Sequence, residues 1–318
     1  MRIEFTVDIP SLGAADREGR ISRDALAELA SAAEAAGFDR LLIAEKGGAQ
    51  DAATLASCVL NATSVLGLEV EHRAGSLSPE IAARQIATLD QLSSGRITVR
   101  MEPASCEAPP LSHEESLARL DEYVVLLKRL WSNNKPIDYE GTFHRLKAAF
   151  SGAKPFNGSS VPLALAGASG TAVKIAARHA DLFVLPAATM EETRRTIERV
   201  RVAASCHRRA DTIRFALPVR WSANRYAGFA EMGSTGAEAA VIPGAPEKAA
   251  LTLLDYRDIG VTDFIVTGLS TARDISAFGS AVAPMVRRAL AHRGFDQRED
   301  IQARSANVVY AHWGRYSA

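Results

Sequence analysis

Cysteine is scarce in this chain of 318 residues, and the three cysteines lie far apart. Cys58, Cys106 and Cys206 form no CxxC pair and no metal-ligand spacing, and they do not make a disulfide framework. Cys58 lies in an apolar helical run and is expected in the core. Cys106 follows a predicted strand, so it either lines a pocket or is structural, because loops after strands carry chemistry in α/β folds.

An excess of charge is also missing. Lys plus Arg and Asp plus Glu each number 37, so the formal net charge is zero and nothing indicates a nucleic-acid partner or an acidic membrane surface. No apolar run reaches the ~18 residues of a membrane span. The first residues, MRIEFTVDIP, are typical of a strand and not of a signal peptide, so a cytoplasmic protein is expected.

Several well-known catalytic and binding motifs are absent. No Gly-x-Gly-x-x-Gly follows the first predicted strand, which removes support for a dinucleotide-binding sheet. The sequence also has no serine-hydrolase elbow, no paired-carboxylate pattern and no HExxH. With 47% hydrophobic and 23% charged residues, the chain nevertheless has enough apolar material for a large core.

Short apolar runs alternate with helical segments along the chain. Such runs are typical of strands buried on both faces. The predicted strands are Ile3–Ile9, Arg40–Glu45, Leu68–Arg73, Ile97–Glu102, Pro162–Gly167, Asp181–Pro186, Ile213–Arg220 and Asp263–Gly268. Eight strands alternating with eight helices predict one closed (β/α)8 TIM barrel rather than an open sheet.

Helix signals support this alternation. Gly37 is expected to end the first helix, and Ser78 with Pro79 is expected to begin the third as N-cap and first residue. The last segment, Ala272–His292, is expected to be one helix. Insertions are predicted after strand four (136–161, with a hairpin at IDYEGTFHRL) and after strand seven (221–244). The expected domain is 1–293, followed by a tail, 294–318.

The chemistry of a barrel of this kind lies at the carboxyl ends of its strands. There the run Gly167, Ala168, Ser169 and Gly170 joins a strand to a helix, and small residues with free N–H groups favour a phosphate. The alternative is a plain turn with Ser169 as N-cap.

Four charged side chains near this end remain open to two interpretations. Arg73 and Arg220 end strands three and seven and are either anion ligands or solvated rim residues. His113 begins helix four and is either a site residue or a cap. Arg100 points either into the barrel or outward, and several arginines at the mouth would suit a phosphate or an acidic substrate.

Four ordered blocks resemble the luciferase-like flavin monooxygenases, most closely the alkanesulfonate branch. They are SPEIAARQIATLDQLSSGR, LDEYVVLLKRLWSNNKPIDYEGTFHRL, PLALAGASGTAVKIAARHADLFVL and GAPEKAALTLLDYRDIGVTDFIVTG, and the resemblance covers roughly residues 1–293. It implies a homodimeric barrel that binds reduced FMN from a separate flavin reductase. It also implies oxidation of a small organic substrate with O2 through a flavin C4a-peroxide.

Carried over residue by residue, the resemblance makes Arg73 and Gly167–Gly170 cofactor-binding, with Arg220 and His113 as polar groups beside the flavin. Other family positions differ. Ala49-Gln50-Asp51 replaces Cys-Glu-Asp, Leu269-Ser270-Thr271 replaces Tyr-Pro-His, and Arg100 replaces an Asn. These departures leave a second hypothesis open, in which the chain is a catalytically degenerate member that binds a small ligand or serves as the partner of an active homologue.

Overall fold

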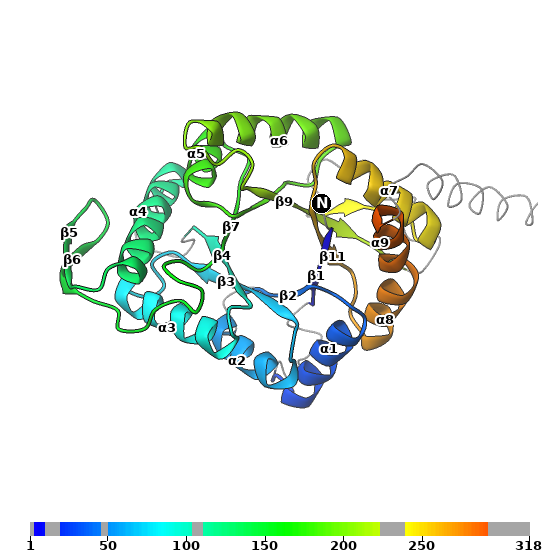
Figure 1. The fold of residues 1–318 in the computed structure, drawn as a ribbon, viewed down its shortest axis with the longest axis horizontal. Helices are drawn as coiled ribbons and strands as arrows, with labels where there is room; N and C mark the ends of the chain where they lie inside the picture. The colour runs from blue at the N-terminus through cyan, green and yellow to red at the C-terminus, as the bar shows by residue number, and fades with distance from the viewer. Residues whose placement is uncertain (1–2, 10–19, 46–49, 104–110, 223–238, 292–318) are drawn as a thin grey trace, which may run out of the picture.

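Eight parallel strands close into a barrel that a ring of helices surrounds (Figure 1). The computed structural model describes residues 3–9, 20–45, 50–103, 111–222 and 239–291. Around the barrel run β1 (Glu4–Asp8), β2 (Arg40–Ile43), β3 (Gly67–Arg73), β4 (Ile97–Glu102), β7 (Leu163–Ala166), β8 (Leu182–Val184), β9 (Arg214–Arg220) and β11 (Asp263–Thr267). Pairing of β11 with β1 closes the ring, which confirms the predicted (β/α)8 barrel.

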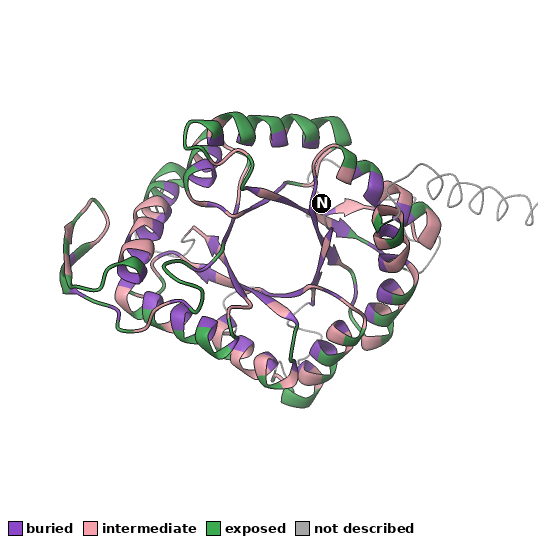
Figure 2. Cartoon of the chain, in the orientation of Figure 1, coloured by how far each residue is buried: buried purple, intermediate pink, exposed green. Residues whose placement is uncertain are grey.

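The helices lie outside the strands, and their inner faces are buried while their outer faces are exposed (Figure 2). They are α1 (Arg23–Ala35), α2 (Ala52–Ala62), α3 (Pro79–Leu92), α4 (His113–Ser132), α5 (Gly170–His179), α6 (Met190–Ser205), α7 (Pro246–Asp258), α8 (Ala272–Ala281) and α9 (Ala283–Ala291). The predicted signals are confirmed: Ser78 caps α3 with Pro79 in its first turn, and Gly37 follows α1 with φ +77°. Within the described ranges, no helix has the length and apolar character needed to cross a bilayer.

Two parts of the chain differ from the expectation or add to it. The segment 272–292 was expected to be one helix, but α8 and α9 are separate, with the break at Val282. Pro284 explains the break, because it has no N–H to donate to Ser280 and its ring would clash with that carbonyl. The hairpin predicted after β4 is present as β5 (Ile137–Glu140) and β6 (Arg145–Ala149), and a short strand, β10 (Ala240–Val241), pairs with the end of β9.

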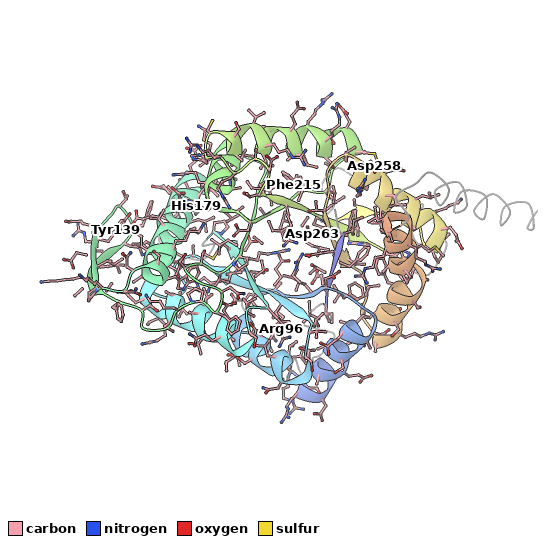
Figure 3. The ribbon with its side chains drawn as sticks, in the orientation of Figure 1. Arg96, Tyr139, His179, Phe215, Asp258 and Asp263 are labelled. Carbon is pink, nitrogen blue, oxygen red and sulfur yellow. The ribbon has the colours of Figure 1, made fainter. Side chains whose placement is uncertain are left out.

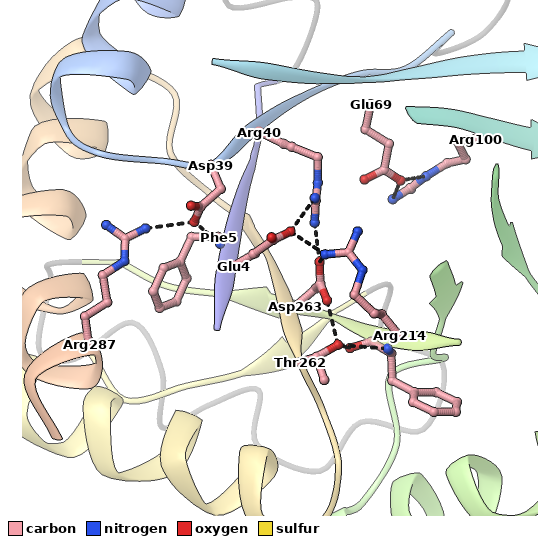
Figure 4. Close-up of polar contacts among 11 residues, drawn as sticks. Glu4, Phe5, Asp39, Arg40, Glu69, Arg100, Arg214, Thr262, Asp263 and Arg287 are labelled. Atoms are coloured by element: carbon pink, nitrogen blue, oxygen red, sulfur yellow. Dashed lines mark hydrogen bonds and ion pairs between the residues drawn. The ribbon is translucent and has the colours of Figure 1, made fainter. Parts of the chain in front are cut away.

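Side chains alternate between the helix layer and the inside of the barrel. Phe5 packs outward against Phe278 of α8, with ring centroids 5.5 Å apart, whereas its neighbour Glu4 points inward (Figure 4). Side chains fill the ring that the ribbon leaves open (Figure 3). Apolar residues from five strands form one part of that filling: Leu42, Ala164, Leu182, Val184, Ala216 and Ile265.

Charged residues form the floor of the barrel, at the amino ends of the strands. Arg40 donates to Glu4 at 2.5 Å and also pairs with Asp263. Arg214 contacts the same two carboxylates, lying 3.1 Å from Asp263 (Figure 4). Burial alone would raise the pKa of Glu4, but Arg40 and Arg214 outweigh it and hold that pKa at about 2. The floor is thus a network of two cations and two anions that closes the end opposite the mouth.

Candidate active site

The loop after β7 has the geometry of an anion cradle. Gly167 adopts φ +137°, and a Cβ on it would lie 2.5 Å from the Cβ of Ala172, so only glycine fits there. The Ser169 hydroxyl accepts from the N–H of Ala172 at 3.1 Å and so caps α5, which is the simpler of the two roles predicted for it. Within the described ranges, the N–H groups of Gly170 and Thr171 make no intramolecular hydrogen bond.

Those two N–H groups lie at the positive end of α5, where an anion is favoured. The space on the Cβ side of Gly170 is open, because an added Cβ would meet no heavy atom of the described residues within 4 Å. Arg199 of α6 donates to the carbonyl of Ala168 and brings a guanidinium to the loop, a residue that the sequence reasoning missed. The loop therefore has the free N–H groups and the positive charge that a phosphate would need, and phosphate binding there stays a prediction.

Arg73, at the end of β3, is held by carboxylates. Its guanidinium donates to the carbonyl of Glu45 at 3.0 Å and to the Glu71 carboxylate at 3.2 Å, and its Nε lies 3.5 Å from a Glu45 carboxylate oxygen. Arg73 thus lies at the predicted mouth, but the structure pairs it with acids of this chain.

Arg100 points into the barrel, which decides between the two orientations left open by the sequence. Its Nε and Nη2 both lie 2.7 Å from one oxygen of Glu69, whose side chain is completely buried (Figure 4). Burial disfavours the charge of Arg100, but Glu69 outweighs it and raises the pKa of Arg100. The two side chains thus form an ion pair inside the barrel.

Glu71 and Glu102 are mouth residues that the sequence reasoning missed. Burial raises the pKa of both carboxyls above the usual range. The neighbouring charge of Glu71 adds to the effect on Glu102, and that of Glu45 adds to the effect on Glu71. The signal was present in the strands themselves. GLEVEHR and ITVRME carry polar or charged residues at every second position, and in a barrel strand those positions share the inner face.

Arg220 and His113, the two residues predicted to lie beside the flavin, come from different parts of the barrel. Arg220 ends β9 and is exposed, and His113 is the exposed first residue of α4, which follows β4. Three steps around the barrel separate β4 from β9. Cys106, the predicted pocket residue, and Ala49 of the Ala49-Gln50-Asp51 run lie outside the described residues. Asp51 caps α2 by accepting from the N–H of Thr54 at 2.7 Å.

Behind the mouth, a buried hydrogen-bond chain fixes the loop that leads into α3. His72, also missed from the sequence, faces outward and its Nε2 lies 2.9 Å from the hydroxyl of Tyr123, which donates to the carbonyl of Leu77 at 3.1 Å. Burial lowers the pKa of His72 to about 4, so the imidazole is neutral at pH 7. At the opposite end, Nε2 of His179, which is labelled in Figure 3, lies 3.1 Å from the carboxylate of Asp121.

This architecture has known counterparts. The family model for luciferase-like monooxygenases matches residues 3–227. The chain belongs to the luciferase-like monooxygenase family. Its resemblance to that family, stated from four sequence blocks, is thereby confirmed, as is the barrel that goes with it.

Solved structures agree with the family assignment at the level of the fold. The long-chain alkane monooxygenase LadA is similar with a TM-score of 0.78 and 16% identity, over 91% of this chain and 92% of that one. EDTA monooxygenase (EmoA) from Chelativorans sp. BNC1 gives 0.74 and 16%, over 91% and 94%. A coenzyme F420-dependent tetrahydromethanopterin reductase from Methanopyrus kandleri gives 0.73 and 18%, over 89% and 99%. The same barrel therefore occurs both in proteins named as monooxygenases and in a reductase named for coenzyme F420.

Proposed function

We propose that this luciferase-like barrel is a monooxygenase that uses reduced FMN, supplied by a separate flavin reductase, to oxidise a small organic substrate with O2. The supporting observation is the loop Gly167–Gly170, which presents unbonded N–H groups and open space at the start of α5. When bound, the reduced flavin supplies the activation of oxygen.

The residues of this chain would bind and orient the cofactor. The N–H groups of Gly170 and Thr171 would donate to its phosphate, and Arg199 would add positive charge at the edge of the same loop. The small side chains of Ala44 and Ala166, near the carboxyl ends of β2 and β7, leave room for a flat ring system above the barrel filling. Arg220 and His113 stay predicted as polar groups beside the ring.

Two alternatives have specific support. Structural neighbours named for coenzyme F420 include the M. kandleri reductase and an F420-dependent secondary alcohol dehydrogenase with 21% identity, so F420 is the competing cofactor. The departures from the family pattern, such as Arg100 at an Asn position, support a degenerate member that keeps the barrel without the reaction.

An anaerobic titration of the purified chain with FMN, FMNH2 and F420, followed by tryptophan fluorescence, tests the proposal. Tighter binding of FMNH2 than of FMN or F420, with O2 consumption when a reductase is added, is the expected result. Tighter binding of F420 than of FMNH2 would show that the proposed cofactor is wrong and that F420 is the cofactor. Failure of all three to bind would favour the degenerate member.

A matched pair of variants tests the phosphate loop. Gly170→Asp places a carboxylate beside the free N–H groups at the start of α5. Its negative charge is favourable at the N-terminus of a helix, so the fold should be kept, but it repels a bound phosphate. Gly170→Asn has nearly the same size without the charge and serves as the control. We expect the Asp variant to bind FMNH2 at least tenfold more weakly than the Asn variant, and equal binding would remove the loop from the site.

A homodimer through α2 and α3 remains part of the proposal. The outer surface of α2 carries no charged side chain, and exposed Ile81 and Leu92 lie on the outer face of α3. A second copy would cover this surface, whereas a solvated helix is usually charged. Sedimentation velocity should show a dimer for the wild type and a monomer for Leu92→Glu, and a monomeric wild type would contradict the assignment.

A further inference from the structure

The inner face of the barrel is divided into an apolar part and a polar part. The strands β7, β8, β9 and β11 contribute small or branched apolar side chains such as Ala164, Val184 and Ile265. The strands β1, β3 and β4 contribute Thr6, the ion pair of Glu69 and Arg100, and, nearer the mouth, Glu71 and Glu102. A ligand entering the mouth would thus meet an apolar side and a charged side.

Among the buried oxygen atoms on the charged side, two that belong to fully buried residues have no hydrogen-bond partner within the described ranges. They are Oγ1 of Thr6 and Oε2 of Glu69, and both residues are completely buried. Thr6 faces the interior, because Glu4, two residues earlier on β1, belongs to the barrel floor. Buried polar atoms in native proteins are almost always paired, so these oxygens indicate that a donor from elsewhere reaches this wall.

Above them lies a carboxylate without a donor. The described residues give no hydrogen bond to the side chain of Glu102, which is partly buried at the end of β4. Arg100 and Arg73 attract Glu102 and partly offset the effect of burial on its pKa, but Arg100 forms its ion pair with Glu69, and Arg73 forms ion pairs with Glu45 and Glu71.

Acceptors are therefore in excess on this wall. Five carboxylates, those of Asp8, Glu45, Glu69, Glu71 and Glu102, lie around the two guanidiniums of Arg73 and Arg100, so negative charge predominates when all are ionised. An acidic substrate, which the arginines suggested from sequence, would be repelled here. A group that brings both positive charge and N–H donors would pair with Glu102 and relieve the repulsion between Glu71 and Glu102.

We propose that this wall binds a protonated amine of the substrate, with Glu102 accepting from the ammonium group and the apolar side of the barrel taking the hydrocarbon part. The inference rests on the proposed function for the identity of the ligand as substrate. The binding wall itself is a property of β1, β3 and β4.

Calorimetric titration of the full chain with hexylammonium, hexanoate and hexanol tests this, with and without FMN. The three probes share a hydrocarbon chain and differ in charge. We expect hexylammonium to bind at least tenfold more tightly than the other two at pH 7.5. Hexanoate binding as tightly as hexylammonium would overturn the inference.

Two variants assign the effect. Glu102→Gln keeps the shape and removes the charge, and should weaken hexylammonium binding at least tenfold. Glu198→Gln, on the exposed outer face of α6, is the control and should bind as the wild type does. Unchanged binding in Glu102→Gln would overturn the role of Glu102.

A third readout does not depend on the variants folding. In the wild type, hexylammonium affinity should rise with pH between 4 and 7, because burial raises the pKa of Glu102 and ionisation creates the partner. A flat profile would overturn the inference. Hexylammonium binding without FMNH2 binding would overturn only the proposed cofactor, and FMNH2 binding without hexylammonium binding would overturn only this inference.

Discussion

Replacing Glu4 by Gln in the barrel floor should destabilise the protein in a strongly pH-dependent way. The variant keeps the volume of the side chain but leaves Arg40 and Arg214 facing only Asp263. The pKa of Glu4 falls from 4.5 to about 2 on folding, and each unit corresponds to roughly 1.4 kcal/mol. The ionised form therefore contributes at most about 3 kcal/mol, somewhat less because the side chain is 26% exposed to screening solvent.

The sign of the pH dependence follows from the lowered pKa. The contribution of Glu4 is complete above pH 4.5 and disappears as the pH falls through about 2, because the unfolded chain takes up the proton first. The stability gap between wild type and Glu4→Gln should be about 2 to 3 kcal/mol at pH 7 and less than half of that at pH 3.

Urea unfolding followed by the fluorescence of the buried Trp131 and Trp221 measures this gap at each pH. Glu140→Gln, at a side chain 80% exposed on the hairpin, is the control and should change stability by less than about 0.5 kcal/mol. Equal stability of Glu4→Gln and wild type at pH 7, or a gap of the same size at pH 3, would refute the reasoning.

Three other perturbations have defined outcomes. Because the pKa of His72 drops to about 4 on folding, protonation of His72 should lower the wild-type free energy of unfolding by up to about 3 kcal/mol as the pH falls from 6.5 to 4. Urea titrations of His72→Phe should show no such loss over this pH range, and a loss of the same size in the variant would mean that another group causes it. Gly167→Ala should lower the free energy of unfolding by about 2 to 4 kcal/mol, because Gly167 has a positive φ and a Cβ there would clash with Ala172. Gly170→Ala should leave stability unchanged, and equal melting temperatures for the two variants would contradict the strain argument. Arg100→Met should cost about 3 to 5 kcal/mol by leaving Glu69 buried without a cation, and adding Glu69→Gln should restore part of it; no recovery would argue against the ion pair.

The frame of this protein is readable from its sequence because strands buried on both faces and capped helices have local signatures. Ser78 and Pro79 begin α3 as their types predict, and Gly37 takes the positive φ that follows a helix end. The break between α8 and α9 was missed because the apolar spacing continues through it, and only Pro284 marks it. The spacing of apolar residues shows which face of a helix is buried. A short kink leaves the buried face nearly unchanged, so the spacing does not reveal the break.

The lining of the mouth is less readable, since its character depends on which side chains meet across strands. Arg73 was expected at the mouth and the orientation of Arg100 was left open, and their charges suggested an anion site because their carboxylate partners could not be read from the sequence. Glu69 and Glu71 lie on β3, and only the barrel register puts Glu71 beside Arg100 and Glu102 beside Arg73. A pair formed between neighbouring strands leaves no spacing in the sequence.

The position of these charges bears on how the family frame can accept a new substrate. The helix layer contacts the outward residues of β3 and β4, such as His72 and Met101, while the inward residues face only the barrel interior. Inward residues near the mouth can therefore change from apolar to charged without disturbing the helix packing, provided that each new buried charge finds a partner. Glu69 and Arg100 satisfy that condition within the chain. Among the described residues, no side chain donates a hydrogen bond to Glu102, and for this reason we propose that a cation arrives there with the substrate.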